Sequence, residues 1–352
     1  MILSPHIDRL RALDATLRKA IRGQDRVIPE VVERVKIGES GLATPGRPKG
    51  SFLFIGPTGV GKTELARVLA RSLYDQKEPF RLDMSEFSSE DAIKNFIGDE
   101  KGGLGRLGDL LSRYSEGILL VDEIEKAHRF VVDVFLQILD AGRVTCGTGR
   151  TFDLSRFYVI FTSNIGTADI LRAKHLNFTQ IEKYVLAQVA TAFRPEFLGR
   201  ISSKLVFNKL SYPIQLEIAR LNLDREREFL AQRGHEIRFA EDVLTFLIQK
   251  GFDKYLGARP LRDVMEKYIR APIADYLIAG SSALGRGILT VHPTKTHLVF
   301  PASCVDSRCV PQPDRCWRCG GRQCRFASHP FPTAFRKRDG FHGRPRPPAP
   351  AG

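Results

Sequence analysis

The sequence lacks any long run of uncharged apolar residues. Across its 352 residues, no segment approaches the roughly 18 consecutive apolar residues that a membrane-spanning helix requires. Residues 1–20 are amphipathic and charged, and they contain no apolar signal core followed by a small-residue cleavage site. These absences exclude the usual signals for membrane insertion and secretion, and we expect a cytoplasmic protein with no membrane partner.

An excess of positive charge is small in the first 300 residues, where basic and acidic residues nearly balance, and is concentrated beyond them. The formal net charge is +14, and residues 301–352 supply +7 of it through ten Lys or Arg and three Asp or Glu. This segment also holds nine of the 20 prolines, five of the six cysteines and the only tryptophan, Trp317. The composition therefore changes near residue 300. The positive charge of the chain therefore comes partly from its tail, which weakens the argument for a nucleic-acid partner.

The tail has too few apolar residues to form a core, and we expect a disordered, basic, proline-rich coil. A zinc knot stays open as the alternative, because Cys316 and Cys319 form one C-x-x-C pair. No second such pair occurs, and the spacing of the other tail cysteines, Cys304, Cys309 and Cys324, is irregular.

Short apolar runs alternate with helical patterns over the first 205 residues. Runs of strand length occur at 51–56, 80–84, 117–121 and 157–164. This alternation predicts an α/β fold with a mainly parallel sheet covered by helices on both faces. Three helical segments closed by glycine and a small hairpin then predict a largely helical second domain. We therefore expect four parts: N-terminal helices (1–48), the large domain (49–205), the small domain (206–300) and the tail (301–352).

Residues 56–63, "GPTGVGKT", match the phosphate-binding pattern G-x-x-x-x-G-K-[ST] between a predicted strand and a predicted helix. Backbone N–H groups of such a loop surround the phosphates of a nucleotide. Lys62 is expected to reach the β- and γ-phosphates, and Thr63 to bind Mg²⁺. A glycine turn with a chance lysine is the alternative. The predicted nucleotide-binding residues are Gly56, Pro57, Thr58, Gly59, Val60, Gly61, Lys62 and Thr63.

Two acids follow the apolar run at 117–121, in "GILLVDE". Ligand sites of open α/β sheets lie at the C-terminal edge of the strands, where Asp122 and Glu123 are expected. Asp122 would hold Mg²⁺ through its water shell, and Glu123 would polarise the attacking water. An apolar run ending in Asp-Glu is common alone. With the phosphate-binding loop it predicts an ATPase that uses ATP and Mg²⁺.

The sequence resembles the AAA+ ATPases of the Clp family, most closely the second ATPase module of ClpB-type disaggregases. The resemblance extends from about residue 10 to 300 and excludes the tail. It is carried by "GSFLFIGPTGVGKTELARVLA", "DMSEF", "GILLVDEIEKAH", "LDAGRVTCGTGRTFDL", "FTSNIGT", "FRPEFLGRI" and "LGARPLRDVMEK". It implies a P-loop AAA+ sheet followed by a small helical lid domain. It also implies a chaperone that hydrolyses ATP to unfold proteins.

The resemblance implies roles for three further residues. Asn164 resembles the first sensor, which orients the lytic water, although a strand-end asparagine can also simply cap a turn. Arg200 resembles the arginine finger, which reaches the nucleotide of a neighbouring subunit. Arg194 competes for that role, and a surface arginine is the plain alternative. Arg259 resembles the second sensor, with a solvated helix-start arginine as its alternative. If both arginines act as the resemblance implies, hydrolysis requires a ring, expected to be a hexamer.

The segment "NFIGDEKGG" (95–103) occupies the place of the family's outer pore loop, and it is about five residues shorter. Phe96, followed by Ile97, stands where the family has a tyrosine that grips polypeptide, since an aromatic ring can pack against any chain. The alternative is a core phenylalanine that closes a helix. Residues 142–150 resemble the inner pore loop, with Cys146 where an acid is usual.

The resemblance implies an unfolded or aggregated polypeptide as the substrate. We expect no peptidase partner, because no Ile-Gly-Phe or Ile-Gly-Leu tripeptide lies between "FTSNIG" and "FRPEF". A nucleic-acid-dependent motor or loader that uses the basic tail is the alternative function. A scaffold that binds ATP without remodelling is a third. The sequence favours the first, because the motifs around Arg200 and Arg259 belong to protein remodellers.

Overall fold

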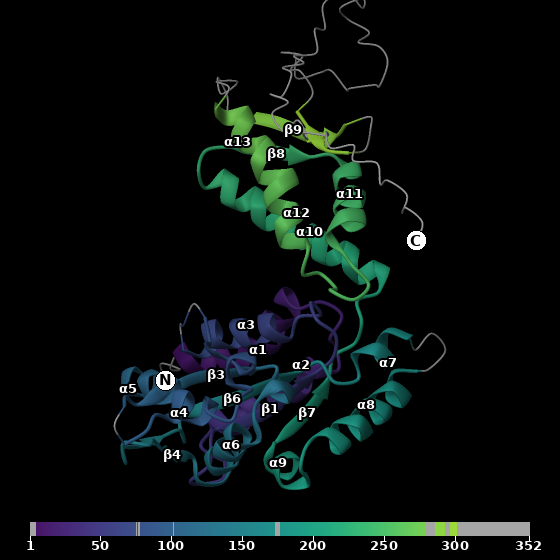
Figure 1. Cartoon of the computed structure of the whole chain (residues 1–352). Helices are drawn as coiled ribbons and strands as arrows, with labels where there is room; N and C mark the ends of the chain where they lie inside the picture. Colours follow the sequence, from purple (N-terminus) through teal and green to yellow (C-terminus); the bar gives the residue numbers. More distant parts are fainter. Residues whose placement is uncertain are drawn as a thin grey trace, which may run out of the picture. The chain divides into compact units, whose positions relative to one another are not determined.

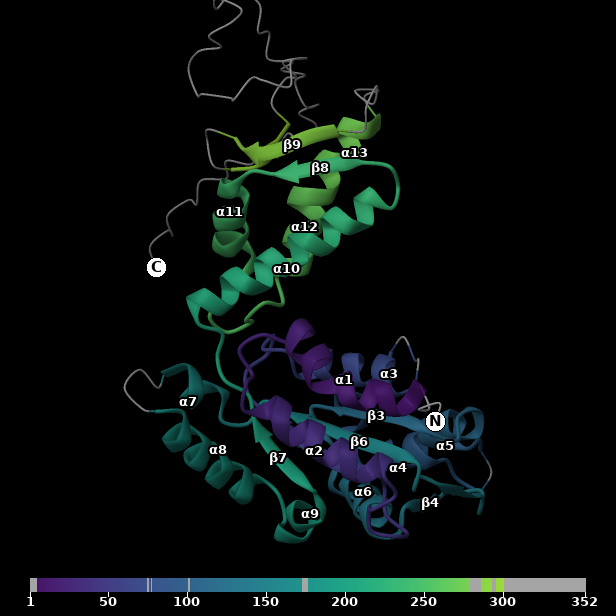
Figure 2. The same cartoon turned by 180° about the vertical axis from the view of Figure 1, so that it is seen from behind.

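The computed structural model describes residues 5–74, 76, 78–100, 102–172, 177–278, 286–292 and 296–300. The chain divides into two compact units, residues 1–299 and 300–352. The predictions for the tail and its cysteines lie outside the described residues. All helices and strands among the described residues lie in the first unit (Figures 1 and 2).

A five-stranded parallel sheet forms the centre of the N-terminal part, in the order β2-β3-β6-β1-β7 (Figure 1). Every residue of β1, β3 and β6 is buried, as expected for parallel strands covered on both faces. The five strands are β1 (Gly50–Ile55), β2 (Phe80–Asp83), β3 (Gly117–Asp122), β6 (Phe157–Ser163) and β7 (Ser203–Val206).

Alternate residues of the strands belong to two hydrophobic clusters. Phe52 and Phe54 of β1 face one cluster, and Leu53 and Ile55 face the other. The first cluster is completed by α1 (Pro5–Ala20), α2 (Val27–Glu39) and α3 (Lys62–Tyr74). Both faces of the sheet are therefore covered.

The opposite face is covered by the helices that follow β2, β3 and β6. These are η1 (Met84–Phe87), α4 (Ala92–Ile97), α5 (Gly105–Arg113), η2 (Ile124–Lys126), α6 (Arg129–Ala141), α7 (Thr167–Arg172), α8 (Phe178–Ala192) and α9 (Pro195–Arg200). An antiparallel hairpin, β4 (Arg143–Thr145) with β5 (Thr151–Asp153), packs against the same cluster.

The remaining elements form a smaller, mostly helical part, as the sequence predicted. Its sheet has the order β10-β9-β8, and β9 pairs antiparallel with β10 as the predicted hairpin. The Arg270 guanidinium binds the buried Glu226 carboxylate at 2.9 Å and links η3 to α10. The elements are α10 (Tyr212–Ala231), β8 (Glu236–Phe239), α11 (Glu241–Gly251), α12 (Leu261–Met265), the π-helical η3 (Glu266–Arg270), α13 (Ala271–Ile278), β9 (Arg286–Val291) and β10 (Leu298–Val299).

Candidate functional site

The predicted phosphate-binding loop joins the C-terminal end of β1 to the start of α3. Gly56, Gly59 and Gly61 have φ angles of 143°, 73° and 109°, which residues with a Cβ rarely adopt. A Cβ on Gly59 would lie 2.1 Å from the Leu256 carbonyl oxygen, so a side chain is excluded there as well. The loop therefore presents its backbone at a helix N-terminus, where anions bind.

Lys62 is buried and points back over this loop. Its Nζ donates hydrogen bonds to the carbonyl oxygens of Gly56 and Pro57, at 3.0 Å for Pro57, and to Asn164 Oδ1 at 2.9 Å. Burial lowers the pKa of Lys62 to about 8, and the charge of Glu125 opposes this shift. The ammonium group thus has neutral oxygens as its direct partners, and the phosphates of a nucleotide would supply the counter-charge.

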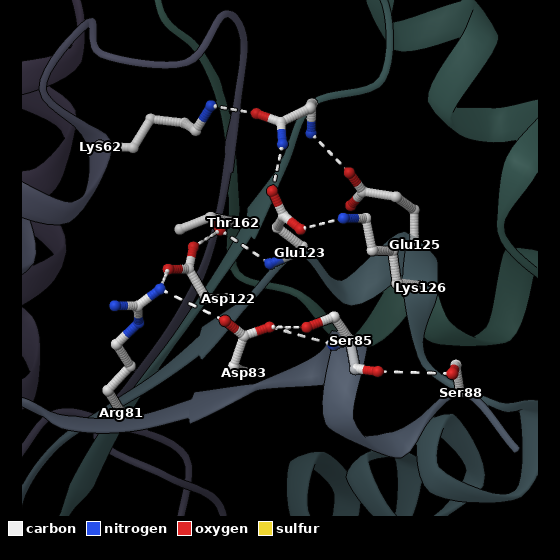
Figure 3. A network of polar contacts seen from close by, with 11 residues as sticks. Lys62, Arg81, Asp83, Ser85, Ser88, Asp122, Glu123, Glu125, Lys126 and Thr162 are labelled. Carbon is white, nitrogen blue, oxygen red and sulfur yellow. Dashed lines mark hydrogen bonds and ion pairs between the residues drawn. The ribbon is translucent and has the colours of Figure 1, made fainter. Parts of the chain in front are cut away.

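Asp122 ends β3 and uses both of its carboxylate oxygens (Figure 3). Its Oδ1 accepts a hydrogen bond from Thr162 Oγ1 on the neighbouring strand β6. Its Oδ2 forms an ion pair with the Arg81 guanidinium of β2 at 2.8 Å. The carboxylate is therefore fixed between two strands at the predicted edge of the sheet.

Glu123 has a left-handed backbone, with φ 56° and ψ 52°. Among the described residues it is the only one other than glycine with a positive φ. Its N–H donates to Thr162 Oγ1 at 3.0 Å. Its carboxylate accepts a hydrogen bond from Asn164 Nδ2 at 3.0 Å and pairs with Lys126 Nζ at 2.5 Å. The turn aims Glu123 at the predicted first sensor rather than into the core.

Asn164 connects the phosphate-binding loop to the acids. Its side-chain oxygen accepts from Lys62 and its side-chain nitrogen donates to Glu123. Its backbone N–H donates to Glu125 Oε1 at 2.9 Å, while Glu125 Oε2 is buried without a hydrogen-bond partner among the described residues. The structure thus brings four predicted residues, Lys62, Asp122, Glu123 and Asn164, to one place.

The predicted arginines lie in different surroundings. Arg200 pairs with Asp140 at 2.5 Å, and Arg194 pairs with Asp133 at 2.9 Å. Arg259 is exposed, and the N–H of the preceding residue, Ala258, donates to the Gly59 carbonyl oxygen at 3.1 Å. The segment that carries Arg259 therefore touches the phosphate-binding loop through its backbone. Neither Arg200 nor Arg194 joins the cluster around Lys62, and the roles given to the arginines remain predictions.

A cavity of about 320 Å³ adjoins the phosphate-binding loop. This volume falls in the range of small-molecule sites. No sequence motif predicted it, because its walls come from segments far apart in the chain. It is lined by Pro57, Val60, Leu171, Lys209, Leu210, Gln215, Ile248, Phe252, Asp253, Lys254 and Gly257. The walls mix apolar and polar side chains, and a cavity of this size beside a phosphate-binding loop has room for the base of a nucleotide.

The residues present also fit Mg²⁺. Thr63 lies partly buried at the start of α3, and Asp122 offers carboxylate oxygens at the adjacent sheet edge. Mg²⁺ prefers such oxygen ligands and is usually held by one or two of them together with phosphates and water. ATP and Mg²⁺ are the cofactors of this type of site.

Sequence reasoning missed Arg81, Thr162, Glu125 and Lys126. A signal existed for Thr162 of β6, which precedes Asn164 by two residues, because side chains two residues apart along an extended chain point to the same side. Arg81 stands in the same relation to Asp83 on β2. Strand alternation could have placed both beside the acids, but it gives no indication of which partners they bind.

The structure corrects the prediction for Phe96, the aromatic residue expected on the outer pore loop. Phe96 belongs to α4 and is 0% exposed, with ring centroids 5.1 Å from Phe87 and 5.4 Å from Phe135. The helix turns its side chain into the core, so the prediction of an exposed gripping residue is wrong for this structure. Ile97 packs partly buried against the same cluster, and Cys146 is buried. The core alternative accounts for Phe96.

Comparisons with known proteins match this geometry. Residues 47–204 match the family described as "AAA domain (Cdc48 subfamily)". Residues 210–290 match the "C-terminal, D2-small domain, of ClpB protein". The chain belongs to the Clp family of AAA+ ATPases. The family resemblance and the predicted fold class are confirmed.

Relatives of this Clp-family chain include the ClpB chaperone proteins of Meiothermus ruber and Dichelobacter nodosus. They are 39% and 37% identical to it over 286 and 299 residues, or 79% and 83% of the chain. The matches cover 34% and 35% of the relatives, so the chain spans about a third of their length.

Two solved structures of Hsp104 are also similar. The Saccharomyces cerevisiae Hsp104–ADP complex has a TM-score of 0.76 and 32% identity, covering 86% of this chain and 53% of its own. A closed-state Hsp104 with ATPyS and FITC casein has a TM-score of 0.73 and 32% identity, covering 85% and 52%. None of the helices described in this Clp-family chain is long and apolar enough to cross a membrane.

Proposed function

We propose that this chain hydrolyses Mg·ATP and uses the reaction to remodel polypeptides. The observation that carries the proposal is the continuous set of hydrogen bonds from Lys62 through Asn164 to Glu123. It joins the residue expected to hold phosphates to the residue expected to activate water. This link supports the proposal, because phosphoryl transfer needs a group that holds the phosphates close to a group that orients the attacking water.

Each residue of the candidate site has a defined task in this proposal. Lys62 binds the phosphates in place of the carbonyl oxygens that it now contacts. The Glu123 carboxylate accepts a hydrogen bond from the attacking water and so polarises this water, while Asn164 orients the same water through its side-chain amide. Mg²⁺, held by Thr63 and Asp122, would neutralise charge that develops on the phosphates. Arg259 approaches the same nucleotide from the small domain.

The proposed assembly is a hexameric ring in which Arg200 reaches the nucleotide of a neighbouring subunit. An arginine supplied in this way stabilises charge in the transition state. The names of the ClpB chaperone relatives and the casein-bound Hsp104 support unfolded or aggregated polypeptide as the substrate. A cytoplasmic location and the absence of a peptidase partner remain predictions. No observation favours the nucleic-acid alternative.

Steady-state ATP hydrolysis by the wild type and Glu123→Gln tests the site. We expect the substitution to lower turnover by about 100-fold or more, since it removes the group that polarises water. Glu116→Gln is the matched control, because it makes the same change next to β3 at the end opposite Glu123. Equal rates for the wild type and Glu123→Gln would refute the proposal.

Mixing Arg200→Ala with Glu123→Gln subunits tests the ring. Each variant alone is expected to be nearly inactive, whereas mixed rings contain sites with an intact Glu123 and an intact neighbouring Arg200. We expect mixing to restore part of the activity, and sedimentation with ATP to show assembly. No recovery in assembled mixed rings would contradict a role for Arg200 in a neighbouring site.

Substrate class is tested by adding unfolded polypeptide or DNA to the hydrolysis assay. Stimulation by casein is the expected result. Stimulation by DNA alone, lost steeply as salt is added, would instead support the nucleic-acid alternative.

A further inference from the structure

Arg81 of β2 reaches across to the carboxylate that ends the neighbouring strand. Its Nη2 lies 2.8 Å from Asp122 Oδ2 and 3.4 Å from Asp83 Oδ2 (Figure 3). The strands are parallel, and Asp83 is aligned with Asp122 in their register. The guanidinium therefore lies between two acids at the same edge of the sheet.

The two oxygens of Asp122 differ in how firmly they are held. Thr162 Oγ1 accepts the Glu123 N–H, so its own hydrogen is directed to Asp122 Oδ1 inside the buried strand pair. Oδ2 faces Arg81, whose side chain is 53% exposed, whereas that of Asp122 is 12% exposed. Oδ2 is therefore the oxygen that can exchange its partner.

Asp83 provides a second position for the arginine. Its Oδ1 accepts hydrogen bonds from the N–H and the hydroxyl of Ser85, at 3.0 and 2.6 Å, which fixes this carboxylate. The bond to the Ser85 hydroxyl lowers the pKa of Asp83, so it remains charged. A guanidinium that leaves Asp122 can thus remain paired by shifting toward Asp83.

We propose that Arg81 is a positioning residue that occupies the metal-facing oxygen of Asp122 until Mg²⁺ replaces it. This inference rests on the proposed function, which makes Asp122 the acid that faces Mg²⁺. A carboxylate this shielded is costly to leave without a counter-charge, and Arg81 supplies one. Arg81 and the hydrated ion compete for the same oxygen, so Arg81 sets the metal concentration at which the site fills.

The expected size of the competition follows from the exposure of the pair. Partly exposed ion pairs contribute little net free energy, and their loss corresponds to a roughly two- to fivefold change in an equilibrium constant. Arg81→Gln should therefore bind the metal roughly two- to fivefold more tightly than the wild type. Arg81→Lys keeps the charge and should stay closer to the wild type.

The test measures Mn²⁺ binding at saturating ADP, by the loss of the electron paramagnetic resonance signal of the free ion. Arg156→Gln is the matched control, because this arginine forms an exposed ion pair with Glu116 at 2.6 Å outside the candidate site. Hydrolysis against free Mg²⁺ provides a second readout, with a lower half-saturating concentration expected for Arg81→Gln. Thermal unfolding verifies that all variants are folded.

Unchanged or weaker Mn²⁺ binding by Arg81→Gln would overturn the inference, as would the absence of Mn²⁺ binding by the wild type. A wild type that binds Mn²⁺ and ADP without turning over ATP would instead refute the proposed function. The metal titration would then still decide whether Arg81 competes for Asp122.

Discussion

Sequence motifs predicted the nucleotide-binding edge of the sheet and the two loops that resemble pore loops. In the structure, the side chains at the sheet edge lie as predicted, whereas those at the loops do not. At the sheet edge, polar side chains from the start of α3 and from the C-terminal ends of β3 and β6 meet at hydrogen-bond distance. At the loops, the aromatic expected on the surface is in the core. Strand ends fix where a residue must lie, whereas a loop motif leaves the direction of its side chains to packing.

The two loops are also bonded to each other. The Gly147 N–H donates to the Ile97 carbonyl oxygen at 2.9 Å, which links the hairpin β4–β5 to the end of α4. A Cβ on Gly147 would lie 2.4 Å from the Gly98 carbonyl oxygen. Glycine thus allows the backbones to touch. Residues 97–99 are therefore held against the hairpin rather than extended away from it.

Phe96→Ala is expected to lower the free energy of unfolding more than the other substitutions that test this difference. A fully buried ring between Phe87 and Phe135 leaves a cavity when truncated, and we expect a loss of about 3–5 kcal/mol in the free energy of unfolding. Denaturant titration measures it. Phe130→Ala is the control, because Phe130 is 37% exposed. Unchanged stability with lost polypeptide unfolding would restore the gripping role of Phe96.

At the sheet edge, Lys62 is expected to make the stability of the folded protein depend on pH. Burial lowers its pKa from 10.5 to about 8 in the folded protein, so between these values the unfolded chain binds more protons than the folded one. Stability without nucleotide should therefore rise with pH across this window, by at most about 3 kcal/mol, and the cost of burying the charge is fully present below pH 8. Thermal unfolding of the wild type and Lys62→Met at pH 7 to 10 measures it. Parallel curves for the two proteins would contradict the shift.

Gly147→Ala tests the bond between the loops. The added methyl group must displace backbone atoms of Gly98 and Asp99, which we expect to cost about 1–3 kcal/mol of unfolding free energy. Gly103→Ala is the control, since a Cβ there meets nothing within 4 Å. If both substitutions prove equally mild in denaturant titrations, the loops are not packed together as described.

The sequence was sufficient to predict the parallel sheet, the small helical part and the cluster of Lys62, Asp122, Glu123 and Asn164. Apolar runs define buried strands, and residues that end parallel strands share an edge. It could not predict the Arg81–Asp122 pair, which depends on which strands become neighbours, or the cavity beside the loop, whose walls come from segments far apart in the chain. It predicted Phe96 wrongly as a gripping residue, since a helix end and a loop start can share one pattern. Only packing against Phe87 and Phe135 distinguishes them.

The left-handed backbone of Glu123 has a consequence for the history of this sequence. Residues with a Cβ lose roughly 1–2 kcal/mol in that conformation, which glycine adopts freely. Selection for folding alone would therefore favour glycine or asparagine at position 123. A homologue that no longer needs to hydrolyse ATP should acquire such a residue early and become more stable as it does. The residue at this position would then distinguish homologues that hydrolyse ATP from those that have lost hydrolysis.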